Sequence, residues 1–336
     1  MKSRIRIIVF LLFTGILQAF PQSPREWVIE QTRRLAPEEF EILLRNQQLP
    51  GTVSFTTTSG GTRMSSHDGD SFAYLNSDNL EELLGEMDTN IHEINHGITH
   101  DWAFHYVDKN SLRVSERMVY YFYIRPGEEF FLNSSIPFFP SRDLVPNIPE
   151  DRRTFRFETY VNGTSSTQNH GLLGLLDEFN SYFHSLKVSW LLKPAYLEVE
   201  PDPADAYINW ISGLQSVGEA YYEFRFFIFE YLLHARSVNP DVYKAIKADT
   251  RFRDVFNAVS ANYGFYIRAL EQQFLTGWKE YAASRSLQFM VSENRVFMGR
   301  GDGMRGFRNV LEDAEKLKLV FASGRYAEVM RETGFK

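Results

Sequence analysis

The sequence predicts an α+β fold, with a mixed first part followed by a mainly helical second part. Before Pro201, segments of helical periodicity alternate with short runs of β-branched and aromatic residues. After Pro203, long stretches with apolar residues every three or four positions dominate. A chain of 336 residues with 43% hydrophobic residues is also long enough to bury a substantial core. We therefore expect one large unit or two closely packed parts.

The N-terminus has the pattern of a secretory signal peptide. A basic segment, Lys2–Arg6, precedes an apolar run over residues 7–17, and Leu17-Gln18-Ala19 is an acceptable cleavage site. The apolar run is shorter than the roughly 20 residues of a membrane-spanning helix, so a cleaved signal is favoured over an uncleaved anchor. We therefore expect residues 1–19 to be removed, no membrane span to remain, and the protein to be exported, either periplasmic or secreted.

The remaining elements follow from periodicity and from helix-capping residues. In the first part, helices are expected over Arg25–Asn46, over Asn79–Thr99 with Ser77 or Asp78 as N-cap, and over Ser165–Leu192. Strands are expected within Val53–Phe55, Phe72–Tyr74, Val119–Phe131 and Phe155–Val161. In the second part, helices are expected over Ala204–Ala235, Arg251–Ser284 and Gly306–Phe321.

Composition excludes several classes of function. The formal net charge is −7 and no run of Lys or Arg occurs, which argues against nucleic acid as a partner. The chain has no cysteine, so disulfides, a cysteine nucleophile and thiolate metal ligands are excluded. Any bound metal must therefore be held by His, Asp or Glu.

One motif carries chemical information, the sequence His92-Glu93-Ile94-Asn95-His96. Histidines four residues apart in a helix lie about 6 Å apart along the axis and on nearly the same face, so both imidazoles can reach one zinc ion. The glutamate after the first histidine can take a proton from a metal-activated water. The surrounding helix has an apolar stripe that leaves the histidines on its flank: Leu80, Leu84, Met87, Ile91, Ile94 and Ile98.

A catalytic zinc site needs a third protein ligand, and four side chains are candidates. His100 extends the spacing, but it lies about 12 Å from His92 along a straight helix. His105 and His170 fall at loop or helix-edge positions and stay open. Glu178 is favoured because it lies within the second predicted long helix, on a face that also carries glycines.

Together, the H-E-x-x-H helix and a downstream glutamate on a second helix resemble the gluzincin clan of zinc metallopeptidases. The resemblance covers these two helices. It implies one zinc ion held by His92, His96 and Glu178, with Glu93 as general base and a peptide or protein as substrate. It also implies a zincin-like catalytic region, a small sheet plus the two metal helices, over residues 20–200. Residues 201–336 then form a helical region packed on it.

The sequence departs from the clan at one position. Many members have Asp four residues after the ligand glutamate, where it orients a zinc histidine, but this chain has Tyr182. Asp177, Asp88 or Asp101 could replace that carboxylate. Donors to the oxyanion could be Tyr182, His170, His105 or Tyr106. The strand expected at residues 72–74 could pair with an extended substrate.

Other functions fit the sequence less well. Glu93 to His96 matches one E-x-x-H pair of a di-iron helix bundle, but no second pair occurs. No G-x-S-x-G motif supports a serine hydrolase. The stronger alternative is an exported zincin-like binding or envelope-associated protein with weak or no catalysis, which Tyr182 favours.

Overall fold

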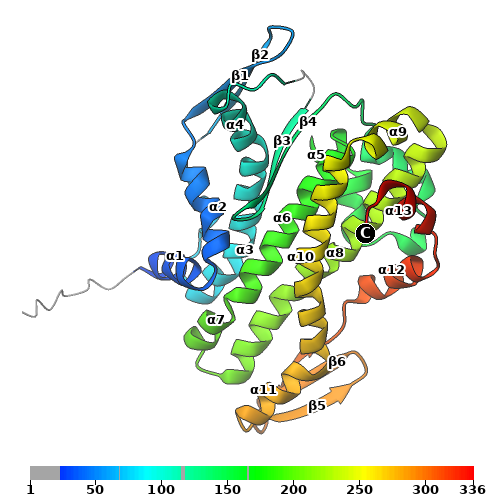
Figure 1. Cartoon of the computed structure of the whole chain (residues 1–336). Coiled ribbons are helices and arrows are strands. Elements are labelled where there is room, and N and C mark those ends of the chain that lie inside the picture. Colours follow the sequence, from blue (N-terminus) through cyan, green and yellow to red (C-terminus); the bar gives the residue numbers. More distant parts are fainter. Residues whose placement is uncertain (1–22, 68, 115–117, 165) are drawn as a thin grey trace, which may run out of the picture.

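The computed structural model of the chain describes residues 23–67, 69–114, 118–164 and 166–336, and the expected signal peptide lies outside them. The fold is mixed, with long helices and small antiparallel sheets (Figure 1). The helices are α1 (Pro24–Leu35), α2 (Pro37–Gln48), α3 (Leu80–Gly97), α4 (Ala103–Lys109), α5 (Ser166–Asn169), α6 (Leu172–Leu191), α7 (Lys193–Val199), α8 (Pro203–Val238), α9 (Pro240–Ala248), α10 (Thr250–Gln272), α11 (Trp278–Ser284), α12 (Glu312–Ala322) and α13 (Ala327–Thr333).

The strands form three separate antiparallel sheets. Strand β1 (Thr52–Thr56) pairs with β2 (Thr62–Ser66), and β3 (Met118–Arg125) pairs with β4 (Glu128–Ser134). Strand β6 (Arg295–Gly299) lies between β5 (Gln288–Ser292) and β7 (Arg305–Arg308). The expected strand Val119–Phe131 is thus a hairpin, which turns at Gly127 with a φ of 80°.

Side-chain caps fix the starts of the helices that build the core. Ser23 caps α1 and forms a reciprocal capping box with Glu26. Asn79, rather than Ser77 or Asp78, caps α3 and accepts hydrogen bonds from two backbone N–H groups. A π-helical turn, Ile98–Trp102, joins α3 to α4, so the helical segment continues past the expected end at Thr99.

Helix α6 lies at the centre of the molecule (Figure 1). It packs most extensively against α8, α3 and α10, and nearly all of its residues are buried. A single hydrophobic core runs from Val28 in α1 to Phe335 near the C-terminus. The predicted division after residue 200 falls between α7 and α8, and the core continues across it. In the described part of the chain, none of the helices is both long enough and apolar enough to cross a membrane.

Several predicted elements are wrong. Phe72–Tyr74 is a turn rather than a strand, so it is not an edge for pairing with a substrate. The segment expected as strand Phe155–Val161 contains a π-helical turn, Glu158–Asn162. In the second part, β5, β6 and β7 interrupt the helical region, and the helix expected from Gly306 begins only at Glu312.

Candidate metal centre

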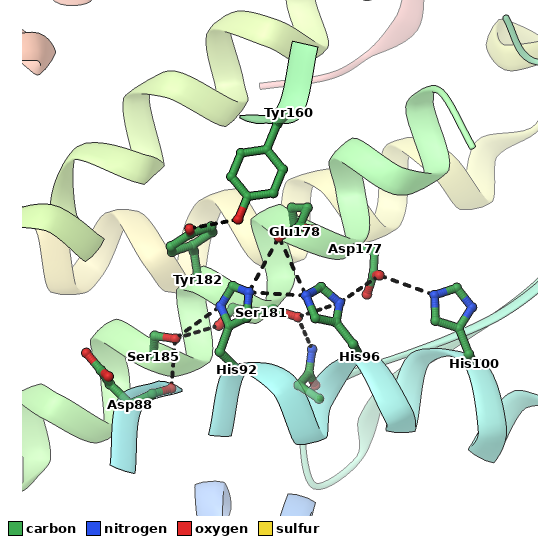
Figure 2. Close-up of polar contacts among 11 residues, drawn as sticks. Asp88, His92, His96, His100, Tyr160, Asp177, Glu178, Ser181, Tyr182 and Ser185 are labelled. Atoms are coloured by element: carbon green, nitrogen blue, oxygen red, sulfur yellow. Dashed lines mark hydrogen bonds and ion pairs between the residues drawn. The ribbon is translucent and has the colours of Figure 1, made fainter. Parts of the chain in front are cut away.

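Two imidazoles and one carboxylate converge between α3 and α6 (Figure 2). The Nε2 atoms of His92 and His96 lie 3.1 Å apart, and Oε2 of Glu178 lies 3.4 Å from the first and 3.5 Å from the second. Ligands placed about 2.0–2.1 Å from a tetrahedral ion are separated by about 3.3 Å. These three atoms therefore form a triangle of a size that can hold a metal ion.

The packing of α3 against α6 brings these side chains together. Met87 and Ile91, in the apolar stripe of α3, are fully buried, and the flank with His92 and His96 faces α6. On α6 the carboxylate of Glu178 is nearly buried, and its Oε2 atom accepts no well-oriented hydrogen bond from any described residue. A buried carboxylate oxygen without a partner is costly, and a cation at the centre of the triangle would satisfy it. The residues present therefore fit a metal ion.

A second layer of polar groups orients the two histidines. Oδ2 of Asp177 lies 2.8 Å from Nδ1 of His96. Oγ of Ser185 lies 3.4 Å from Nδ1 of His92 and 3.2 Å from the carbonyl oxygen of Asp88. An imidazole whose Nδ1–H donates to such an acceptor keeps the Nε2 lone pair free for a metal. Among the three proposed carboxylates, Asp177 thus occupies the orienting position.

The other two proposed carboxylates lie elsewhere. Asp88 faces this layer with its backbone carbonyl, while Asp101 binds Ser65 at 2.5 Å and lies 3.8 Å from His67.

The electrostatics of the cluster favour a positive charge. Burial raises the pKa of the Asp177 carboxyl, but His96 and His100 outweigh it and hold this pKa well below the ordinary value. Burial likewise opposes the ionisation of Glu178, yet the neighbouring imidazoles of His92 and His96 lower its pKa. For His96, burial lowers the pKa, while the charges of Asp177 and Glu178 raise it well above the ordinary value. The two anions therefore stabilise a cation here, and a metal ion can take the place of the His96 proton.

A pocket of about 300 Å³ lies beside the triangle, and His92 is the member of the triangle that lines it. Glu93, the predicted base, lines this pocket beside His92 and is half-buried. Tyr182 lines it as well, with its ring edge-on to the His92 ring at 4.5 Å between centroids. The remaining lining residues come from α3, from the segment before α5, and from α6 and α8: Asp88, Thr89, Phe155, Arg156, Tyr160, Ser185, Gly213, Ser216 and Val217.

The remaining candidate ligands lie away from the triangle. His100 faces Oδ2 of Asp177 at 3.4 Å, on the side of His96 opposite Glu178 (Figure 2). Nδ1 of His170 binds the hydroxyl of Tyr120 at 2.5 Å. His105 and Tyr106 line a separate pocket with Trp102. Of the four oxyanion candidates, the structure therefore places Tyr182 alone in the pocket beside Glu93.

Three residues of the site were missed in the sequence, and only one of them leaves a signal there. Ser185 follows Glu178 by two helical turns and lies on the same face of α6, which helical spacing could have indicated. Tyr160, whose hydroxyl lies 3.0 Å from that of Tyr182, and Arg156 come from an irregular segment. They are four residues apart, a spacing that puts both on one face of either a helix or a strand, so the spacing does not show which way they point.

Comparisons with protein-family models, with curated proteins and with solved structures find no match for this chain. The function is therefore not inferred from a fold shared with a characterised protein. The chemistry is inferred from the His92, His96 and Glu178 triangle and from the pocket beside it.

Proposed function

We propose that this chain is a zinc-dependent metallopeptidase. His92, His96 and Glu178 would hold the metal, and Glu93 would act as general base. The observation that supports this most strongly is the triangle of ligand atoms, with edges of 3.1 to 3.5 Å, beside a pocket that both His92 and Glu93 line. Two imidazoles and one carboxylate with an open fourth position are typical of catalytic zinc.

In peptide hydrolysis, the metal ion and Glu93 would each have a separate role. A bound zinc ion would supply Lewis acidity to the scissile carbonyl and to a water molecule. Glu93 would accept a proton from that water and pass it to the leaving amine. Among the described residues, no hydrogen bond or ion pair engages the Glu93 carboxylate, so it is available for this role.

A pair of tyrosines would help to polarise the scissile carbonyl of the substrate. The hydroxyls of Tyr182 and Tyr160 are hydrogen-bonded to each other, so one of their two protons remains free to point at a substrate oxygen. Burial raises the pKa of Tyr160, which keeps this hydroxyl protonated. The pair therefore has the chemistry of an oxyanion donor.

The alternative is an exported zincin-like binding or envelope-associated protein with weak or no catalysis. Its main support was Tyr182, which stands where related sites have an orienting aspartate. Asp177 approaches Nδ1 of His96 closely enough to take that role, and this favours the catalytic proposal.

The test is to compare the purified protein with its Glu93→Gln variant. We expect about one zinc per chain in both, because Gln keeps the shape of the side chain and Glu93 is not a ligand. We expect peptide hydrolysis to fall by at least about 100-fold in the variant, because the base is lost. Zinc is measured by elemental analysis and hydrolysis by mass spectrometry of a peptide library.

Two controls make this comparison decisive. His92→Ala and His96→Ala should each lose both the zinc and the activity while keeping the helical circular dichroism. Protein never exposed to chelator that contains no zinc would overturn the metal site. Equal hydrolysis by the wild type and by Glu93→Gln would overturn the role of Glu93.

A further inference from the structure

The pocket beside the metal centre extends beyond the ligands. It follows α3 back toward its N-terminus, where Asp88 and Thr89 line it about one helical turn before His92. Figure 2 shows Asp88 on the side of His92 that faces away from His96. A substrate bound at the metal would therefore place the side chain of a residue next to the scissile bond within reach of Asp88.

Asp88 is a carboxylate without a cation. Its Oδ1 atom accepts a hydrogen bond from the hydroxyl of Thr89 at 3.0 Å, and no Lys or Arg among the described residues pairs with it. Burial raises the pKa of the Asp88 carboxyl to about 6, because the group has lost part of its hydration and nearby groups compensate little. A positively charged group placed in the pocket would restore that lost stabilisation.

Among the described residues that line the pocket, Arg156 is the one arginine or lysine, and its charge is already neutralised. It donates from Nη1 to Glu223 at 2.6 Å and from Nη2 to the carbonyl and hydroxyl oxygens of Ser216. Its guanidinium also covers one face of the Tyr182 ring, at 4.4 Å from the centroid. Arg156 is therefore not free to receive an anionic side chain, and the uncompensated charges of the pocket, Asp88 and Glu93, are negative.

The walls suit a long side chain with a charged end. Tyr182, Val217 and Phe155 offer apolar surface to an aliphatic stem. The hydroxyls of Thr89 and Ser185 lie near Asp88 and can accept additional hydrogen bonds.

We propose that this pocket is a specificity subsite for an arginine or lysine side chain adjacent to the scissile bond, with Asp88 as the residue that pairs with its charge. This inference rests on the proposed peptidase function and names the substrate class of the same site. A guanidinium or ammonium group would reach Asp88, while Glu93 stays free for proton transfer.

The experiment uses the zinc-loaded full chain and matched peptides with Arg, Lys, norleucine or Glu on either side of the scissile bond. We expect the wild type to prefer Arg and Lys. Asp88→Asn should lower kcat/KM for these peptides by roughly 10- to 100-fold, the effect of losing a charged hydrogen bond, and should leave the norleucine peptide nearly unchanged. Asp88→Glu should restore part of the preference. Glu82→Gln, which removes an exposed charge from the same helix, is the matched control and should change nothing.

Binding provides a readout that does not need turnover. Hydroxamates of N-blocked arginine and norleucine are titrated into zinc-loaded protein by calorimetry, with tighter binding of the arginine compound expected in the wild type and lost in Asp88→Asn. If peptides are cut without preference and Asp88→Asn has no effect, the subsite is overturned while the peptidase proposal stands. If no peptide is cut but the hydroxamate preference depends on Asp88, the subsite stands and catalysis fails. Loss of zinc in Asp88→Asn would assign Asp88 to the support of His92 and overturn the subsite.

Discussion

At the scale of single residues, two consecutive acids divide the contacts around His96. Successive residues of a helix point about 100° apart, so Asp177 and Glu178 approach the same imidazole from different directions. Glu178 faces Nε2 at 3.5 Å, and Asp177 faces Nδ1 at 2.8 Å (Figure 2). Glu178 is therefore positioned to bind a metal ion, and Asp177 to orient the His96 ring. Tyr182 stands where the gluzincin pattern has an aspartate that orients a histidine. Here Asp177, the residue before Glu178, places its carboxylate against His96 instead.

This geometry predicts different metal affinities for three variants. Glu178→Ala removes a ligand atom and should weaken zinc binding by more than about 100-fold, whereas Asp177→Asn should cost about 10- to 100-fold, as is typical of a group that orients a ligand. His100→Ala should change the affinity by less than about 3-fold, because His100 contacts Asp177 rather than the triangle. Competition against a chelator of known affinity measures all three.

The outcome is informative in either direction. If His100→Ala strips the metal while Glu178→Ala keeps it, the ion lies between His96 and His100, and the π-helical turn after Gly97 would have to supply the ligand geometry. The gluzincin resemblance would then be wrong.

At the scale of elements, the sequence predicts well those segments whose packing is periodic. The apolar stripes of α3 and α6 predicted both helices that carry the candidate ligands, and the spacing within α3 placed His92 and His96 on one face. Each of these patterns is local, since one turn of helix suffices to express it. The approach of Glu178 to the two histidines depends on how α3 packs against α6, which no local pattern records.

The predictions failed where distant residues decide the local conformation. The aromatic and β-branched residues over 155–161 suggested a strand, but Arg156 is drawn inward by Glu223 of α8, and the chain turns. Strand β5 was missed because all five of its residues are exposed, so they show no alternation of buried and exposed positions. Over residues 155–161, tertiary contacts outweighed the local preference for a strand. In β5, the alternating pattern that marks a strand was absent.

One buried ion cluster joins α2 to α6, the helix that carries Glu178. The carboxylate of Glu39 lies 2.5 Å from Nδ1 of His184 and 2.5 Å from Nζ of Lys187, and Glu39 and His184 are fully buried. Burial alone raises the pKa of Glu39, but His184 and Lys187 outweigh it and lower this pKa below the ordinary value. The ionised Glu39 therefore stabilises the fold.

We expect Glu39→Gln to lower the free energy of unfolding by roughly 3–5 kcal/mol at neutral pH, because it leaves Lys187 buried with one exposed partner, Glu38. A lowered carboxyl pKa stabilises the folded state above the unfolded-state pKa of about 4.3. The difference between wild type and variant should therefore be constant near neutrality and shrink as the pH falls through the folded-state pKa of Glu39.

Denaturant titrations at several pH values measure this difference. Glu30→Gln breaks an exposed pair with Arg33 on α1 and should change stability by less than about 0.5 kcal/mol. A Glu39→Gln variant as stable as Glu30→Gln at neutral pH would show that the buried cluster contributes nothing.

At the scale of the whole molecule, the candidate metal centre lies where the two parts of the chain meet. His92 and His96 on α3 and Glu178 on α6 all belong to the first part, and α8 of the second part lines the pocket beside them. Other faces of α6 pack on α8 and α10 in the second part. One hydrophobic core includes all of these helices. A metal ion that links α3 to α6 would therefore stabilise both parts of the chain.

Metal removal should therefore destabilise the whole molecule in one transition. An ion that binds only the folded state contributes RT ln(1 + [M]/Kd), or about 4 kcal/mol when free zinc is 1,000 times Kd. For a chain of this size, that corresponds to an increase in the unfolding midpoint of roughly 6 °C. Calorimetric scans of the zinc-loaded and chelator-treated protein should each show a single peak, lower in temperature without zinc. In His92→Ala the same treatment should shift nothing. Two peaks, with only one moved by the chelator, would instead mean that the parts on either side of residue 200 unfold independently, and that the shared core does not couple them.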